Sequence, residues 1–546
     1  MERRSDIERL LGLATELARH NNYAAALQAF DDFLSRNPAH VDALLQAGLA
    51  ALSSHDPHRA LGYYSAAALH APQHPAVLLG YGQALRDLGQ LDSARVKFEE
   101  MLRHYPSDAD ALTELGLVCR KLGDAAAALR HLDAATRSAP HLMWPRIHLA
   151  MTLRDEGQIE EALQTLAAAL EQDVTNLYAL REAAETARQA GKANVAAGYY
   201  ERLTGLDPGN VESALHWAGQ LKRAGDLDGT ARVLGRLLEQ ADARDNAIAE
   251  LSVLAREFPE RRAEAEAMIG KVAPEKLPLR FLPSISPDCQ PEQITVNQVY
   301  RFLRTLQKRP DIAAWHREFL ERSVRSGERI EHGRPIPWGR NFDYALIRAL
   351  GINFHGKRVA DLGARDGYFG AWLTGEAAQV YVSDYFQGWE EEWHRKDAAE
   401  APDSFAAWQR RWRKMAPNPE RLVCETQDIT KLTYPDEFFD VTVCTSVIEH
   451  MWPLDMKGMS EIVRVTKRGG FIAMSTEMSQ ANQWFRGTYW YGEAAFLARL
   501  IEPHPVDFIG PWNFSLDDPG NDEMRIESVA GREAGLTSSF FGLKKR

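Results

Sequence analysis

Two neighbouring segments in the second half of the chain carry residues whose types and spacing could hold a nucleoside-bearing molecule. An apolar run, 357–362, enters a turn that contains Gly363 and Gly367, and a helix is expected after it. A second apolar run, 379–383, ends on Asp384, seventeen residues after Gly367. Glycines let the main chain approach a ligand, and an acid at the next strand tip accepts hydrogen bonds from ribose hydroxyls. This layout predicts a nucleoside-cofactor site at the open end of a parallel sheet.

Alternating strand and helix patterns must position these residues. Helical patterns come between the first five predicted strands, and the last two strands come late and close together, which favours an antiparallel hairpin at one edge. The predicted strands are 358–362, 379–383, 422–426, 441–445, 471–475, 506–509 and 539–543. The predicted helices are 344–350, 389–415, 453–466 and 492–501.

Six segments, in this order and at predicted strand ends, resemble the class I S-adenosylmethionine-dependent methyltransferases over about residues 341–546. They are Asp361-Leu-Gly363-Ala-Arg-Asp366-Gly367, Asp384, Gln427-Asp428-Ile429, Phe439-Asp440-Val441, Ser446-Val-Ile-Glu449-His450-Met451 and Lys467-Arg-Gly469-Gly470. The resemblance implies a doubly wound seven-stranded α/β sheet with S-adenosyl-L-methionine as the cofactor. The family often has glycine where Arg365 stands, so this side chain should point away from the cofactor.

The resemblance also implies a role for each residue at the predicted cofactor edge. Gly363 and Gly367 would bring the main chain to the methionine part of the cofactor. Asp361 would accept hydrogen bonds beneath this loop, directly from the cofactor amino group or through water. Asp384 would bind the two ribose hydroxyls, for which a carboxylate is a good bidentate acceptor. The alternative for Asp361 is a capping acid, and the alternative for Asp384 is a solvated strand end.

Three further residues complete the implied cofactor set. Asp428 would accept from the adenine amino group, Ile429 would pack on the adenine ring, and Ser446 would line the pocket after the fourth strand. For Asp428 the alternative is an ordinary turn residue.

The acceptor side of the reaction points to His450 and Glu449. Methyl transfer from a sulfonium is an in-line displacement, so the protein mainly supplies alignment and exclusion of water. A base is needed only for a hydroxyl or a protonated amine, and an imidazole suits proton removal near neutral pH. His450 is therefore the first candidate base and Glu449 the second, with Glu477 weaker. The alternative for His450 is a structural residue that caps the next helix.

Aromatic residues gather in two groups of the second half. Flat apolar faces suit sugar rings, aromatic ligands or a cation, but helix packing explains them equally. The first group is Trp389, Trp393, Trp408 and Trp412, and the second is Trp484, Phe485, Tyr489, Trp490 and Tyr491. The four-residue spacings in the first group favour packing on one helix face, whereas the second group lies where this fold often places acceptor-facing loops.

Composition limits the partners and the compartment. The 546 residues carry a formal net charge of −12, which disfavours nucleic acid or an anionic membrane as the default partner. The four cysteines include no Cys-x-x-Cys pair, which disfavours disulfides and a zinc site and favours a cytoplasmic location. No metal site is predicted, because His394, His450 and His504 are isolated. No apolar run is long enough to span a membrane.

The first half repeats itself every 34 residues. Three sets of residues keep this step: helix-ending prolines, small alanines and turn glycines. They are Pro38, Pro72, Pro106, Pro140 and Pro208; Ala26, Ala60, Ala94, Ala128, Ala162 and Ala196; and Gly89, Gly123, Gly157, Gly191 and Gly225. Such spacing predicts helix pairs that cross at the alanine and stack into a solenoid, because each pair can cover its apolar face only against its neighbours.

This pattern resembles the tetratricopeptide repeat family over about residues 7–244, with Thr230 replacing alanine in a degraded seventh repeat. The resemblance implies a groove that holds a peptide or protein. The alternative is a dimerisation or spacer module. The predicted domains are residues 1–244 for the solenoid, 245–340 for capping helices, a Pro-rich linker and a helical lid or connector, and 341–546 for the methyltransferase domain.

The leading functional hypothesis is a methyltransferase that O-methylates a glycan or a natural-product small molecule, with repeats that recruit the acceptor or a partner. One alternative is a protein or peptide methyltransferase whose repeats form the substrate groove. Another is a non-catalytic scaffold, for which Arg365 is the one supporting feature. An NAD-dependent oxidoreductase is disfavoured by the glycine turn and by the late strand pair.

Overall fold

In a computed structural model, the chain divides into two compact units, Met1–Thr230 and Ala231–Arg546. The predicted domain boundaries at 244/245 and 340/341 stay predictions. The structure describes residues 2–283, 305–325, 330–331, 334–335, 338–364, 369–385, 405–479, 483–485, 488–510, 514 and 536–546.

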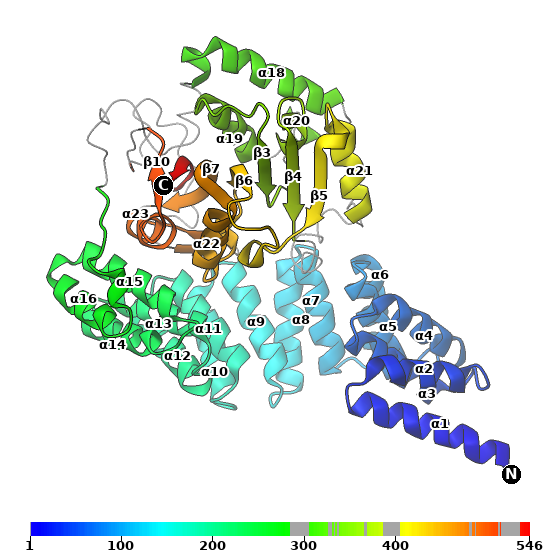
Figure 1. Ribbon diagram of the computed structural model, residues 1–546. Helices are drawn as coiled ribbons and strands as arrows, with labels where there is room; N and C mark the ends of the chain where they lie inside the picture. The colour runs from blue at the N-terminus through cyan, green and yellow to red at the C-terminus, as the bar shows by residue number, and fades with distance from the viewer. Residues whose placement is uncertain are drawn as a thin grey trace. The chain divides into compact units, whose positions relative to one another are not determined.

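Paired helices build the N-terminal unit (Figure 1). From the second pair on, the first helix of each pair has 13 residues, as the repeat predicts. The helices are α1 (Glu2–Arg19), α2 (Tyr23–Leu34), α3 (Val41–Ser53), α4 (Pro57–His70), α5 (Pro75–Asp87), α6 (Leu91–His104), α7 (Ala109–Lys121), α8 (Ala125–Ser138), α9 (Met143–Asp155), α10 (Ile159–Leu170), α11 (Leu177–Gln189), α12 (Ala193–Leu206), α13 (Val211–Arg223) and α14 (Leu227–Leu238), which crosses the boundary between the units.

Small residues set the close crossing of the helices in each pair. All six repeated alanines are fully buried, and the five turn glycines have φ between 68° and 84°. A second set of small residues, which the sequence analysis did not predict, faces three of the large residues that follow the alanines: Tyr64, Phe98 and Leu132. A Cβ on Gly82 would lie 2.4 Å from Phe98, and one on Gly116 would lie 2.6 Å from Leu132. These three large side chains therefore fill the space that the missing methyl group of a glycine leaves open.

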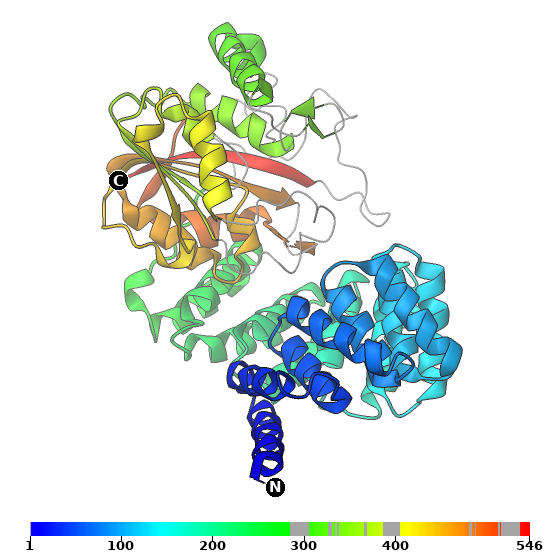
Figure 2. The ribbon, with the colours of Figure 1, turned by 90° about the vertical axis from the view of Figure 1, so that its right-hand side faces the viewer.

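The C-terminal unit contains a seven-stranded sheet in the order β10-β11-β7-β6-β3-β4-β5 (Figure 1). The five strands from β7 to β5 are parallel, while β11 is antiparallel to both β7 and β10. Figure 2 shows the twist of the sheet, with the long red strand β11 beside the orange β7. The strands are β3 (Arg358–Leu362), β4 (Gln379–Asp384), β5 (Leu422–Thr426), β6 (Phe439–Thr445), β7 (Thr466–Ser479), β10 (Val506–Phe508) and β11 (Leu536–Lys545).

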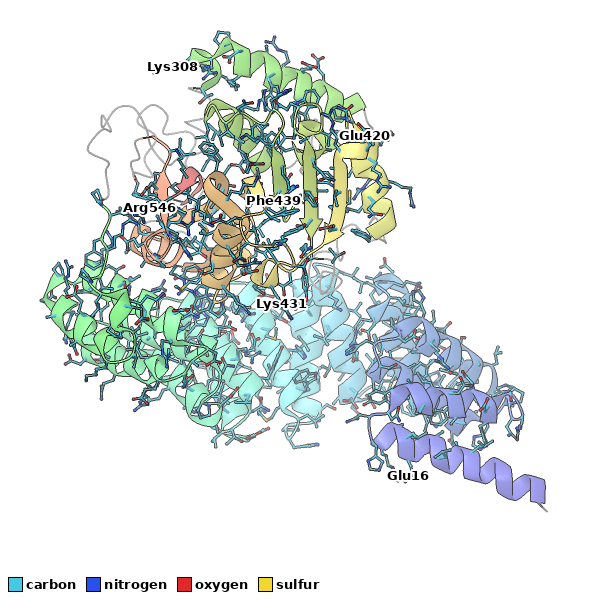
Figure 3. All side chains as sticks on the ribbon, in the orientation of Figure 1. Glu16, Lys308, Glu420, Lys431, Phe439 and Arg546 are labelled. Atoms are coloured by element: carbon cyan, nitrogen blue, oxygen red, sulfur yellow. The ribbon has the colours of Figure 1, made fainter. Side chains whose placement is uncertain are left out.

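Helices and short strands surround this sheet. One continuous apolar core joins side chains of α18 to α21 with the central strands, so that these helices cover one face. Phe439, which begins β6 and is labelled in Figure 3, is fully buried. The remaining elements are α15 (Arg244–Glu257), η1 (Pro259–Arg261), α16 (Arg262–Gly270), η2 (Pro274–Lys276), α18 (Pro310–Arg325), β1 (Ile330–Glu331), β2 (Arg334–Pro335), α19 (Trp338–Ala349), α20 (Phe369–Leu373), α21 (Phe405–Met415), η3 (Pro419–Arg421), η4 (Ile429–Lys431), η5 (Ile448–His450), α22 (Asp455–Val465), β8 (Gln483–Phe485), β9 (Thr488–Trp490), α23 (Glu493–Phe496) and the π-helix η6 (Leu497–Ile501).

The seven predicted strands and the antiparallel pair at one edge are confirmed, but four strands are longer than predicted: β4, β6, β7 and β11, with β7 and β11 extended the most. Strand β7 begins at Thr466, inside the segment that the sequence assigned to a helix end and a turn. The register between β6 and β7 shifts between Phe439 and Val441, and Gly469 has a φ of 72°. A bulge at this glycine absorbs the extra residues, so the strand continues where a turn was expected. Within the predicted Pro-rich linker and lid, residues 284–304, 326–329, 332–333 and 336–337 lie outside the described residues.

Candidate functional site

The predicted cofactor residues come together at the carboxyl ends of the parallel strands, which we call the cofactor edge of the sheet. Asp361 is in the last part of β3, Asp384 ends β4, Asp428 follows β5 and Ser446 follows β6. These four strands are neighbours in the order β6-β3-β4-β5, and parallel strands end at the same edge. The connections from β3 and β6 lead to opposite sides of the strand order, which is the switch point where open α/β sheets bind ligands. Gly367 lies outside the described residues.

Gly363 lets the loops after β3 and β6 come together at this switch point. Its φ is 69°, and a Cβ added there would lie 2.4 Å from Cγ2 of Val447. Both the backbone conformation and the space around it therefore require glycine at this position.

Asp361 has a structural partner as well as its predicted ligand. The residue is 3% exposed, and its Oδ2 accepts a hydrogen bond from the Gly370 amide at 3.0 Å. A Cβ on Gly370 would lie 2.9 Å from the same oxygen, so α20 starts in close contact with β3. Asp361 therefore holds the start of α20, which agrees with the capping alternative. Its contact with the cofactor amino group stays a prediction.

The next two acids differ in their surroundings. Asp384 is 6% exposed at the tip of β4, and its carbonyl accepts from the Gln427 amide at 3.2 Å, which holds the loop after β5 beside it. Oδ1 of Asp428 accepts from both the amide and the hydroxyl of Thr430, at 2.9 and 2.7 Å. One oxygen of Asp428 thus fixes the turn into η4, where Ile429 is buried. The adenine contacts of Asp428 and Ile429 stay predictions.

A buried chain of two hydrogen bonds, which we call the Asp343–Ser475 relay, supports the turn after β6. The sequence analysis did not predict it. The Ser475 hydroxyl donates to Oδ2 of Asp343 at 2.7 Å and accepts from the Ser446 amide at 3.1 Å. Asp343, on α19, is fully buried, and Ser446 has a φ of 51°, which is unusual for a residue with a side chain. The sequence carried no signal for this relay beyond the acid itself, which lies directly before the helix predicted over 344–350. The relay stabilises a backbone conformation next to the cofactor edge.

His450 and Glu449 share the short helix η5 but face different surroundings. Glu449 is fully buried, whereas the side chain of His450 is exposed. An exposed imidazole can meet an acceptor that arrives from solvent, and a buried carboxylate cannot do so without a movement of the loop. The geometry therefore agrees with the order in which the sequence ranked them, and their catalytic roles stay predictions.

The described aromatic residues are packed rather than open. Trp408 and Trp412 lie in the core beneath α21, as their spacing indicated. In the second group, Tyr491 is fully buried and Tyr489 stacks on Trp452 with ring centroids 5.2 Å apart. The other aromatic side chains of the two groups lie outside those that the structure describes. An acceptor platform made by Tyr489 or Tyr491 is thus disfavoured.

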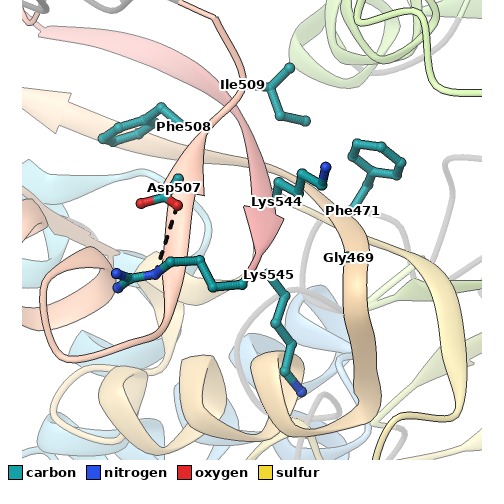
Figure 4. Close-up of a pocket in the computed structure, with 8 residues that line it drawn as sticks. Gly469, Phe471, Asp507, Phe508, Ile509, Lys544 and Lys545 are labelled. Atoms are coloured by element: carbon teal, nitrogen blue, oxygen red, sulfur yellow. Dashed lines mark ion pairs between the residues drawn. The ribbon is translucent and has the colours of Figure 1, made fainter.

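A cavity of about 430 Å³ lies at the other end of the strands from the cofactor edge (Figure 4). Its walls come from the start of β7, from β10 and from the end of β11, where Arg546 pairs with Asp507 at 3.7 Å. Because β7 starts here, the cavity is at the amino ends of the parallel strands, away from the predicted cofactor site. It is lined by Gly469, Phe471, Asp507, Phe508, Ile509, Lys544, Lys545 and Arg546.

Two features of the described residues bear on other functions. Within the described ranges, no group of three or more His, Cys, Asp and Glu side chains is arranged to hold a metal ion. In the same part of the chain, no helix has both the length and the apolar character needed to cross a membrane.

Family models match both halves of the chain. Residues 360–474 match a methyltransferase domain, and residues 11–54, 45–101, 82–142 and 148–211 match a tetratricopeptide repeat. A malonyl-[acyl-carrier protein] O-methyltransferase of Halorhodospira halophila is 28% identical over 166 residues, which are 30% of this chain and 50% of that protein. The CTR9 homolog of Arabidopsis thaliana is 27% identical over 225 residues, which are 39% of this chain and 21% of that protein.

These curated relatives are thus matched over half of their own length or less. Among solved structures, the tetratricopeptide repeat protein YrrB is 24% identical with a TM-score of 0.28, covering 34% of this chain and 96% of YrrB. PilF of Pseudomonas aeruginosa is 20% identical with a TM-score of 0.34, covering 41% of this chain and all of PilF. The predicted combination is confirmed: tetratricopeptide repeats occupy the N-terminal half of this chain, and an S-adenosylmethionine-dependent methyltransferase domain follows them.

Proposed function

We propose that this protein transfers a methyl group from S-adenosyl-L-methionine to an oxygen of a small molecule, a glycan or a natural product, which the repeats or a partner bound to them help to recruit. The observation that carries the proposal is the edge formed by Asp361, Gly363, Asp384 and Ser446 on adjacent strand ends. The donor set fits this cofactor, because buried carboxylates suit ribose hydroxyls and a bare glycine loop suits close approach.

The chain's own residues would act mainly by alignment. When bound, the cofactor supplies a methyl group on a positively charged sulfur, which makes the leaving group neutral. Asp384 would fix the ribose, and the loop at Gly363 would fix the opposite end. The Asp343–Ser475 relay holds Ser446 and the loop that leads to η5. His450, which is exposed at the end of η5, would accept a proton from a hydroxyl acceptor.

Oxygen is favoured as the acceptor atom by two observations. His450 is accessible to an arriving hydroxyl, and the malonyl-[acyl-carrier protein] relative is an O-methyltransferase. A protein or peptide acceptor held in the repeats remains the alternative. A reducing, cytoplasmic location stays part of the proposal, in which the three described cysteines, Cys119, Cys424 and Cys444, are buried.

Calorimetry with the cofactor and with its product S-adenosylhomocysteine tests the first half of the proposal. The intact protein should bind both, and Asp384→Asn, which keeps the shape but removes the charge, should bind about 10- to 100-fold more weakly because it loses charge-assisted hydrogen bonds. A matched control is Asp436→Asn, an exposed acid that pairs with Arg464 away from the cofactor edge. A protein that binds neither compound would be a scaffold.

Labelled cofactor and host lysate test the second half. The proposal expects label in small metabolites, and His450→Gln should lower its transfer without weakening cofactor binding. Alkali then separates carboxyl methyl esters, which are hydrolysed, from ether and N-methyl groups, which survive. Label found only on protein would replace the small-molecule proposal with the peptide alternative.

A further inference from the structure

A single buried arginine connects three elements of the C-terminal unit. Arg499, on η6, has no exposed surface, and its guanidinium forms a two-pronged pair with Asp455 at 2.8 and 2.5 Å. Asp455 is the first residue of α22 and is also fully buried, and Tyr491 donates to its Oδ2 at 2.7 Å. Burial opposes the charge of Arg499, but Asp455 outweighs this and raises the pKa of the guanidinium.

The same guanidinium also binds α15, the helix that follows α14. Nη1 donates to Oε1 of Glu250 at 3.1 Å, and Nη2 donates to Oδ1 of Asn246 at 2.6 Å. Together with the pair to Asp455, these bonds use four of the five N–H groups that an arginine has. The orientation of the guanidinium is therefore set from two sides, by α22 and by α15.

The other side of this arginine faces the loop that carries the candidate base. We call residues 446–454 the post-β6 loop; it runs from Ser446 through η5 to the start of α22. Trp452 lies under the guanidinium at 6.0 Å, and the Pro453 carbonyl is 3.5 Å from Nη2. Met451 packs against Gly458, where a Cβ would lie 2.5 Å from the methionine methyl group. The far end of the loop is thus held by Arg499, while its near end is held by the Asp343–Ser475 relay.

We propose that Arg499 is a positioning residue for methyl transfer, through which α15 sets the geometry of the post-β6 loop beside the cofactor edge. This role rests on the proposed function. A fully buried ion pair is a poor choice for stability alone, because apolar residues of similar volume often do as well. A planar guanidinium with fixed donors does what apolar packing does not: it fixes an orientation. The elements it orients include the loop with Glu449 and His450.

A matched pair of variants on α15 separates this role from simple helix docking. Asn246→Ala with Glu250→Ala removes both α15 acceptors but leaves the pair between Arg499 and Asp455 in place. Arg256→Gln is the control: Arg256 is also on α15, where it pairs with Glu502 and donates to the Leu282 carbonyl at 2.8 Å, and neither of these partners belongs to the post-β6 loop or to α22. Glu250→Gln, which keeps an acceptor, is the conservative variant.

Three readouts are compared: hydrogen exchange of amides 446–454, affinity for S-adenosylhomocysteine, and label transfer at saturating cofactor. The double variant should exchange faster in the loop and transfer about 10- to 100-fold more slowly, since small misplacements have effects of this size. Its affinity for S-adenosylhomocysteine should stay within about twofold, because Asp384 and Gly363 are not disturbed. Glu250→Gln should recover much of the rate, and Arg256→Gln should resemble the unmodified protein.

Two results would overturn the inference. One is hydrogen exchange of amides 446–454 in the double variant at the same rate as in the unmodified protein. The other is an equal loss of label transfer in Arg256→Gln, which would show that docking of α15 explains the effect without a role for Arg499. Failure of the proposed function looks different, because then the unmodified protein itself transfers no label to any acceptor.

Discussion

In the repeats, arginines that recur at the 34-residue step pair with carboxylates of the next repeat. Arg86 pairs with Glu114, Arg120 with Asp155 and Arg154 with Glu182. Their side chains keep between 12% and 43% of their surface exposed. In the methyltransferase unit, Arg499 and Asp455 keep none. Water can replace part of each repeat pair when it is broken, but it cannot reach the buried pair.

This contrast shows how two kinds of fold use charge. A solenoid needs each repeat to match only its neighbour, so small, hydrated and repeated contacts are enough. A site at the edge of a sheet needs several loops held in one arrangement, so it relies on a few buried groups with fixed geometry. Four changes test this contrast, in order of decreasing expected effect.

Removing one partner of the buried pair should have the largest effect. Asp455→Ala leaves Arg499 charged without its main partner, and the C-terminal unit should lose about 3–5 kcal/mol of unfolding free energy. Hydrogen exchange resolves this by segment, with slow amides in β6 and β7 reporting the C-terminal unit and amides in α7 and α9 reporting the repeats. Asp436→Ala, at an exposed acid of the same unit, is the control and should change little. Equal effects of the two variants would contradict the contrast.

Acid should destabilise the repeats through His148. Burial, together with Arg120 and Arg86, lowers the pKa of this histidine to about 4. Below about pH 6.5 this imidazole takes up a proton in the unfolded chain but stays neutral in the folded repeats. The free energy of unfolding therefore keeps its full value above that pH and falls by up to about 3 kcal/mol towards pH 4. Chemical denaturation between pH 7 and pH 4 measures the fall, and His148→Phe should flatten it. An unchanged slope in that variant would show that other groups cause the pH dependence.

Gly363→Ala should weaken cofactor binding. The substitution combines a positive φ with a methyl group placed against Val447, so the loops after β3 and β6 must separate. A strain of about 1–3 kcal/mol corresponds to roughly 5- to 150-fold in affinity for S-adenosylhomocysteine. Gly469→Ala is the matched control, because Gly469 has a similar φ, 72°, but no atom lies near the added methyl group. Gly469 also lies at the other end of the strands from the cofactor edge. Calorimetry should find normal affinity in the control, and a similar loss there would mean that backbone strain alone acts at a distance.

Breaking one repeat pair should have the smallest effect. Arg154→Ala removes a pair to Glu182 at 2.7 Å, and the repeats should lose about 1 kcal/mol or less. Thermal unfolding followed by circular dichroism measures this loss, with Arg120→Ala, in the more exposed pair, expected to lose even less. A loss as large as that of Asp455→Ala would show that the repeats also depend on buried charge.

Local patterns were sufficient to predict the repeats and most strands. The alanines and turn glycines act within one helix pair, so their spacing in the chain is also their spacing in the fold. Asp384 was predicted from its place at a strand tip, whereas Asp361 and Ser446 were implied by the methyltransferase resemblance; the fold brings all three together because parallel strands end at the same edge. The extent of β7 was not predicted, because it depends on a bulge whose glycine also reads as a helix-ending signal.

Contacts between distant parts of the chain were not readable. Ser475 meets Asp343 across 132 positions and Arg499 meets Asn246 across 253, and no periodicity relates such pairs. The sequence by itself determined the stacked helix pairs, the parallel strands and the edge at which their acids collect, because neighbouring residues and strand direction are enough for these. Only the tertiary structure decided which buried charges hold the loops at that edge, because burial removes water as a partner and leaves each charged group to the side chains that folding brings beside it.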